Sequence, residues 1–182
     1  MVLLLIILVV FGVTQTARFL TGGDESDSGQ PSTSQLTLPD YAGLDSQVRL
    51  TYTGPIVARE DFLQIRMSVS ASGRSLAIID GYGGQVQKRQ RLSNDPAAYG
   101  HFLRALYLNN FSAVQDNELG DDERGVCFKG QRIVGQLLED DEQILRLWAA
   151  SCGRELGTMN ALWRDILKLF QDQFPDYRQF TR

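Results

Sequence analysis

The pattern of apolar and polar residues divides the chain into three parts. The first is an unbroken apolar run, Val2 to Val13 (VLLLIILVVFGV), and the first charged side chain is Arg18. A run of this kind is typical of a segment that enters a lipid bilayer. We therefore predict that residues 1–20 form a membrane anchor or signal-anchor helix, with Arg18 reaching the headgroups.

Two alternatives to a retained anchor stay open. The run is marginal in length for a helix that must cross about 30 Å of hydrocarbon. It also matches the apolar region of a cleaved signal peptide, although residues 14–17 (TQTA) fit the preference of signal peptidase poorly. A soluble core helix is the third interpretation, and such a helix would normally show a polar face.

The second part of the chain is polar. Residues 21–35 (TGGDESDSGQPSTSQ) carry no large apolar or aromatic side chain, so they cannot bury enough surface to offset their conformational entropy. We predict a disordered linker over residues 21–43 and a single extracytoplasmic domain over residues 44–177. Residues 178–182 are the C-terminal tail.

The third part begins with the alternation that is typical of strands. Apolar side chains occupy every second position in residues 48–52 and again in residues 63–69. A turn at Ser72–Gly73 leads into a return strand, and residues 85–92 form the next one. These segments predict an antiparallel β-meander.

Each predicted sheet segment is followed by an amphipathic helix. Residues 95–96 (Asp-Pro) supply an N-cap and a first helical residue for a helix that runs to about residue 109. A hairpin of residues 126–138 and 143–152 comes next, and Thr158 is expected to cap a last helix that ends at Pro175. The fold class is therefore α+β, with two successive sheet-then-helix units behind an N-terminal transmembrane helix.

The two cysteines lie on the two arms of the hairpin. If Leu138–Asp141 form a four-residue turn, Cys127 lies directly opposite Cys152. The resulting disulfide would contribute about 3.5 kcal/mol in the chain-entropy model, and it would persist outside the cytoplasm. The alternative is a pair of buried free thiols in a cytosolic protein. The sequence lacks a CxxC motif and a complete zinc-ligand set, so we expect no metal and no cofactor.

The distribution of charged residues along the chain argues against a nucleic-acid partner. The net charge is −4 at pH 7, and residues 1–45 hold Arg18 against five acidic residues, so the rest of the chain is neutral. Binding of nucleic acid needs a domain-wide positive excess or a long basic stripe. Because the sequence has neither, we expect no nucleic-acid partner.

Three segments suggest chemistry without identifying a catalyst. His101 is the sole histidine and hence the sole unperturbed general base near neutral pH, but no nucleophile elbow accompanies it. The glycine-rich segment Asp80–Gly84 is expected to form a bend, because no helix start or GK[ST] motif follows it. The acidic residues between 116 and 123 have the composition of a calcium loop but not its spacing, which favours a solvated loop.

The candidate binding surface lies on the meander. Tyr82, Lys88, Arg89 and Arg91 combine an aromatic ring with basic groups that suit an anionic wall polymer or lipid. The alternative is that the basic run only protects a solvated sheet edge from aggregation.

The last two-thirds of the chain also resemble a recurrent group of proteins. The matching motifs are GVCFKGQRIVGQLL from Gly125, LWAASCG from Leu147, GT at 157–158 and FPDY at 174–177. They resemble a recurrent, uncharacterised group of N-terminally anchored extracytoplasmic proteins in candidate-phyla bacteria of the Saccharibacteria type. The resemblance implies a hydrophobic N-terminal segment, a polar linker and two cysteines that flank a hairpin. It implies no reaction, and its motif residues have structural roles: Cys127, Trp148, Cys152, Gly157 and Pro175.

These observations favour a single-pass, membrane-anchored binding or interaction module on the extracytoplasmic side of a bacterial cell envelope. Its expected partner is an envelope protein or a wall polymer, and no catalytic centre is evident. Two other functions stay open. An envelope hydrolase would use His101 together with a carboxylate and a hydroxyl in one pocket. A structural subunit of a surface filament would pack its apolar N-terminus into the filament.

Overall fold

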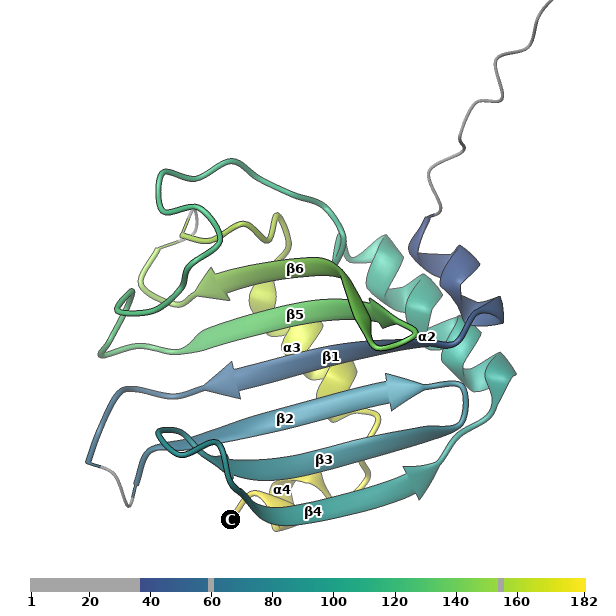
Figure 1. Cartoon of the computed structure of the whole chain (residues 1–182), viewed down its shortest axis with the longest axis horizontal. Coiled ribbons are helices and arrows are strands. Elements are labelled where there is room, and N and C mark those ends of the chain that lie inside the picture. The colour runs from purple at the N-terminus through teal and green to yellow at the C-terminus, as the bar shows by residue number, and fades with distance from the viewer. Residues whose placement is uncertain (1–36, 59–60, 154–155) are drawn as a thin grey trace, which may run out of the picture. The chain divides into compact units, whose positions relative to one another are not determined.

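A six-stranded antiparallel sheet forms the centre of the fold (Figure 1). The computed structural model describes residues 37–58, 61–153 and 156–182. The strand order is β4-β3-β2-β1-β5-β6, so the two predicted units share one sheet that is joined through β1. The α+β prediction is confirmed. The strands are β1 (Ser46–Thr53), β2 (Leu63–Ser70), β3 (Gly73–Asp80), β4 (Val86–Ser93), β5 (Arg132–Glu139) and β6 (Glu142–Ala150).

The helices pack against one face of this sheet; in Figure 1, α3 and α4 lie behind the strands, and α2 and η1 are seen at the right-hand end of the sheet. They are the 3-10 helix η1 (Leu38–Gly43), α2 (Pro96–Leu108), α3 (Trp163–Gln171) and α4 (Tyr177–Phe180). Because side chains alternate along a strand, every second residue of the central strands β1, β2 and β3 points toward the helices and the core. Among these are Val48, Leu50, Met67 and Leu76, which are fully buried beside helix residues such as Phe102 and Phe170.

Helix α2 begins where its sequence predicts. The carboxylate of Asp95 accepts a hydrogen bond of 2.9 Å from the backbone N–H of Ala98, and Pro96 is the first helical residue. An N-cap of this kind satisfies one of the backbone donors that a helix leaves unpaired at its start. The helix then buries four side chains on one stripe, Tyr99, Phe102, Leu103 and Leu106.

The β5–β6 hairpin has a shorter turn than its sequence suggested. Glu139 pairs with Glu142, so the turn consists of Asp140 and Asp141 alone, with φ angles of 48° and 66°. Two residues at positive φ make the tight turn that matches the twist of a hairpin, and aspartate tolerates this conformation. The register also shifts between Leu137 and Leu138. The predicted four-residue turn and its register are therefore wrong.

The last helix starts later than predicted. Thr158 does not cap α3; its hydroxyl accepts a hydrogen bond of 3.1 Å from the backbone N–H of Trp148, and Met159 forms a bridge with Val114. Hydrogen bonds to Trp148 hold this segment against β6 in a non-helical conformation, and α3 begins at Trp163. The short helix α4, which follows Pro175, was not predicted.

Regular structure also reaches further toward the N-terminus than the predicted domain boundary at residue 44. Leu38 and Tyr41 of η1 are buried in the core, and the hydroxyl of Ser46 contacts both the Tyr41 carbonyl and the Tyr99 hydroxyl. The predicted anchor, residues 1–20, and most of the predicted linker lie outside the described residues. Within residues 37–182, apart from the gaps given above, no helix is long and apolar enough to cross a membrane.

Candidate functional site

The second face of the sheet carries no helix in the part of the chain that the structure describes, and it is turned toward the viewer in Figure 1. We call the β1–β4 part of this surface the open face. The register of the four strands defines it, because residues that alternate with the buried set must point to the opposite side. Its central members are Arg49, Thr51, Arg66, Ser68, Ser75, Ala77, Arg89 and Arg91.

Three arginines lie close together at the centre of the open face. Arg49 pairs with Ser68, so it is the diagonal neighbour of Arg66, at about 7–8 Å between backbones. Arg66 and Arg89 both pair with Ala77, so they lie on either side of it, about 10 Å apart. Burial lowers the pKa of the Arg66 guanidinium, and the positive charges of Arg49 and Arg89 lower it further.

Small side chains separate these arginines. Ala77 lies between Arg66 and Arg89 and is only 3% exposed, although no helix of the described residues covers it. The alkyl stems of long cationic side chains can shield a small neighbour in this way. Arg91 lies in the next row, opposite Ser75. The open face therefore consists of small alanine, serine and threonine side chains, between which the long cationic side chains project.

The arginines of the open face lack carboxylate partners within the described residues. The ion pairs found there join Arg124 to Asp122, Arg146 to Glu123 and Lys168 to Asp172. The Nε atoms of Arg49 and Arg66 are buried without a hydrogen-bond acceptor. Arg49 Nη2 donates one hydrogen bond of 3.0 Å to the Gln47 side-chain oxygen, and otherwise these guanidinium groups have no partner among the described residues. An anionic ligand can therefore bind them.

On the same side of the sheet, the acidic loop that follows α2 covers part of β5 and β6. Trp148 is fully buried there, and its indole Nε1 donates a hydrogen bond of 3.0 Å to the Gly120 carbonyl. Arg146 donates to the Asp121 carbonyl and forms an ion pair with Glu123. No group of three or more metal-ligating side chains that could hold an ion is found among the described residues. The loop thus packs on the sheet, and part of its charge neutralises an arginine.

The predicted binding residues do not form one surface. Arg89 and Arg91 lie on the open face, but Lys88 points to the helical side, where its Nζ donates to the Phe180 carbonyl at 2.9 Å and lies 4.3 Å from the Phe180 ring. Tyr82 is 53% exposed at the end of the sheet, in the predicted bend. Its hydroxyl donates to the Val57 carbonyl at 3.1 Å.

Sequence reasoning missed Arg49 and Arg66. Both occupy the polar positions of strands whose apolar positions were recognised, so alternation alone would have placed them opposite the core. What the sequence pattern lacks is the order of the strands, which brings these two residues beside Arg89.

His101 gives the hydrolase alternative no support. It is exposed on α2, on the side away from the open face, and forms no hydrogen bond or ion pair with any described residue. A hollow of about 750 Å³ lies beside the start of α3, but His101 does not line it. This hollow therefore does not place the histidine beside a carboxylate and a hydroxyl, as the hydrolase alternative would require.

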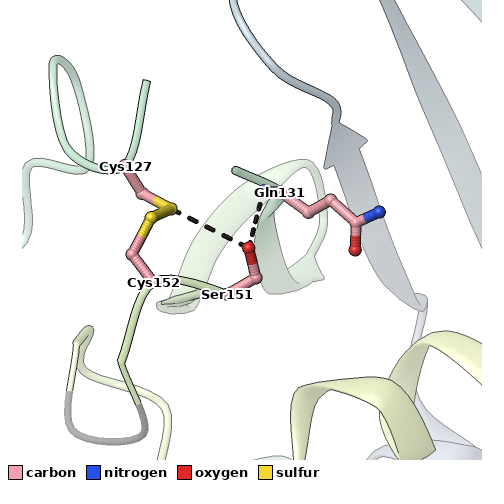
Figure 2. The surroundings of a disulfide bond; sticks show 4 residues. All are labelled: Cys127, Gln131, Ser151 and Cys152. Carbon is pink, nitrogen blue, oxygen red and sulfur yellow. Dashed lines mark hydrogen bonds between the residues drawn. A yellow bond between two sulfur atoms is a disulfide. The ribbon is translucent and has the colours of Figure 1, made fainter. Parts of the chain in front are cut away.

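A disulfide ties the loop before β5 to the end of β6 (Figure 2). Cys127 and Cys152 are joined with a Cα–Cα distance of 5.7 Å, so the predicted pairing is confirmed. The predicted cross-strand geometry is wrong, because both cysteines lie in turns outside the strands. The Ser151 hydroxyl, which accepts a 2.9 Å hydrogen bond from the Gln131 backbone, lies 3.8 Å from the Cys127 sulfur.

Comparison of the sequence with known protein families and curated proteins found no similar protein. No protein-family model matches the chain, and no curated protein is detectably similar to it. The case for a function therefore depends on the geometry and charge of the open face.

Proposed function

We propose that this protein is a membrane-anchored, extracytoplasmic binding module of the bacterial cell envelope, and that its open face binds an anionic wall polymer. The observation that carries the proposal is the group of four arginines, Arg49, Arg66, Arg89 and Arg91, which have no carboxylate partner among the described residues. Guanidinium groups bind phosphate and carboxylate oxygens with paired, charge-assisted hydrogen bonds.

The spread of the arginines favours a polymer over a small ion. Arg49 and Arg91 occupy the same row, three strands apart, which corresponds to about 14 Å between backbones. A single phosphate or carboxylate cannot contact both side chains at once. A chain of repeated anionic groups can contact several of them, and each additional contact raises the overall affinity.

Two further features support a location outside the cytoplasm. The apolar N-terminal run is suited to hold the chain at a bilayer, and the polar residues that follow it are suited to act as a tether. A structural disulfide also requires an oxidising compartment in most bacteria.

The binding proposal is tested with the full chain in neutral-lipid vesicles. The probes are poly(glycerol phosphate), polyglutamate and uncharged dextran. We expect saturable binding of at least one polyanion, and a loss of at least about tenfold in Arg49→Gln/Arg66→Gln, because each charge-assisted contact contributes about 1 kcal/mol or more.

The matched control is Arg104→Gln/Arg178→Gln, which removes the same charge from exposed positions on α2 and α4. This control should retain its affinity. Equal losses in both pairs would show that net charge alone drives binding, and a chain that binds none of the polyanions would contradict the proposal.

Location is tested on intact cells. Protease added outside should digest the C-terminal domain, and Cys127 and Cys152 should resist alkylation after lysis under denaturing conditions without reductant. A domain that survives the protease and carries two reactive thiols would place the protein in the cytoplasm.

A further inference from the structure

Arg132 is a largely buried arginine that has no hydrogen-bond or ion-pair partner among the described residues. It lies on β5, between Thr53 of β1 and Ala150 of β6, and is only 7% exposed. Its guanidinium forms no hydrogen bond or ion pair with any residue that the structure describes, and its Nε is sealed from solvent without an acceptor. The two Nη atoms are not sealed in this way and can be reached from solvent, whereas the buried Nε–H without an acceptor costs about 1–3 kcal/mol. An anion that accepts hydrogen bonds from this guanidinium would therefore be bound favourably.

Two more uncommitted donors stand in the same row of the sheet. Thr53 pairs with Arg132 on one side and with Gln64 of β2 on the other, so the three side chains lie next to one another. Neither the Thr53 hydroxyl nor the Gln64 carboxamide is hydrogen-bonded to a described residue. A guanidinium, a hydroxyl and a carboxamide together offer several hydrogen-bond donors, which is the set that an oxyanion requires.

Loops hold this row at the end of the sheet. The backbone N–H of Ile56 donates a hydrogen bond of 2.8 Å to the Phe128 carbonyl, which links the loop after β1 to the loop before β5. The disulfide at Cys127 fixes the second loop in turn. The three donors therefore stand on rigid strands beside cross-linked loops, so little conformational entropy is lost when a ligand binds.

We propose that Arg132, Thr53 and Gln64 form a subsite for a single oxyanion, a carboxylate or a phosphate group. The subsite deepens the proposed function, on which its biological role rests: it would hold one anionic group of the wall polymer while the arginines of the open face contact the rest of the chain. The guanidinium binds two oxygens of the group, and the hydroxyl and carboxamide donate to the remaining lone pairs.

The Nε–H signal of Arg132 in ¹H–¹⁵N NMR spectra reports on this subsite directly. The full chain in neutral nanodiscs is titrated with sodium phosphate or sodium acetate, while sodium chloride keeps the ionic strength constant. We expect the signal, assigned by its loss in Arg132→Lys, to shift saturably with phosphate, acetate or both. A response to phosphate alone identifies a phosphate group as the ligand, and a response to acetate identifies a carboxylate.

Three variants separate this inference from the proposed function. Thr53→Val, which keeps the side-chain shape, should weaken the titration at least about fivefold. Arg49→Gln/Arg66→Gln should leave the titration unchanged even if polymer binding is lost. Arg132→Met should raise the melting temperature of the ligand-free protein, because it removes a buried Nε–H that has no acceptor among the described residues. No shift beyond the chloride reference with either anion, or a lower melting temperature in Arg132→Met, would overturn the subsite.

Discussion

Replacing Arg66 with an uncharged residue should stabilise the protein at low ionic strength. Arg66 is partly buried, its Nε lacks an acceptor among the described residues, and its pKa is lowered by burial and by the charges of Arg49 and Arg89. A residue that is repelled by its neighbours in the folded state is free of that repulsion in the unfolded chain. Arg66→Gln should therefore raise the free energy of unfolding.

The size of this effect follows from the register. At about 8 Å, two unit charges repel with about 0.5 kcal/mol in water and about 2 kcal/mol at an effective dielectric constant of about 20. Arg89 is more distant and adds less, and dissolved salt reduces both contributions. We expect a gain of about 1 kcal/mol in about 20 mM salt, which falls below about 0.5 kcal/mol in about 0.5 M salt.

Urea unfolding at the two salt concentrations measures this gain. A change of about 1 kcal/mol corresponds to a midpoint shift of about 0.5 M urea for a domain of this size. Arg66→Lys is the matched control, because it keeps the charge and should keep the salt dependence of the wild-type protein. If Arg66→Gln is no more stable than the wild type, or if its gain is the same at both salt concentrations, repulsion within the open face does not act on Arg66.

Three further changes test the fold. Gly130→Ala should hinder the disulfide, because an added Cβ would collide with the Cys127 sulfur and lie 2.6 Å from the Ser151 hydroxyl; thiol titration should detect free cysteine, and stability should fall by up to about 3.5 kcal/mol. A fully oxidised variant of unchanged stability would contradict the crowding at this glycine. Thr158→Val should cost about 1–3 kcal/mol in chemical unfolding, since it leaves the buried Trp148 N–H without its acceptor; Thr158→Ser is the control that keeps the hydroxyl. Burial raises the pKa of Tyr99 above its ordinary value of 10.0, so the folded state holds its proton longer than the unfolded chain, and stability should decline as the pH rises above about 10. Burial also raises the pKa values of Tyr52 and Tyr177, so these residues contribute to the same decline. Urea midpoints that are equal at about pH 8 and pH 11 would contradict this prediction.

Local sequence patterns predicted the helices and strands better than they predicted which elements contact one another. The alternation in residues 48–52 and 63–69 identified β1 and β2, and Asp95 with Pro96 identified the start of α2, because these signals depend on near neighbours in the chain. The start of α3 was missed because Thr158 bonds to Trp148 across the sheet, which no local signal reveals. The hairpin register was missed because two aspartates at positive φ shorten the turn.

The candidate site was predicted only in part for a related reason. Lys88 and Arg89 are adjacent on one strand, so they must point to opposite faces, and alternation applied to the basic run would have separated them. Arg49 and Arg66 come near Arg89 through the strand order β3-β2-β1, which is a property of the whole sheet. The burial of the Arg132 Nε without an acceptor depends on the packing of β5 between β1 and β6, so it can be found only in the folded structure.

The central place of β1 has a consequence for how the chain is made. This strand is the first of the sheet to be synthesised, and one of its two neighbours, β5, follows about 80 residues later. Until then β1 exposes a row of unpaired backbone groups to which other nascent chains can attach. During synthesis the sheet is therefore incomplete for a time and can associate with other nascent chains of the same protein. A chaperone or holdase that covers β1 during that time would raise the yield of folded protein.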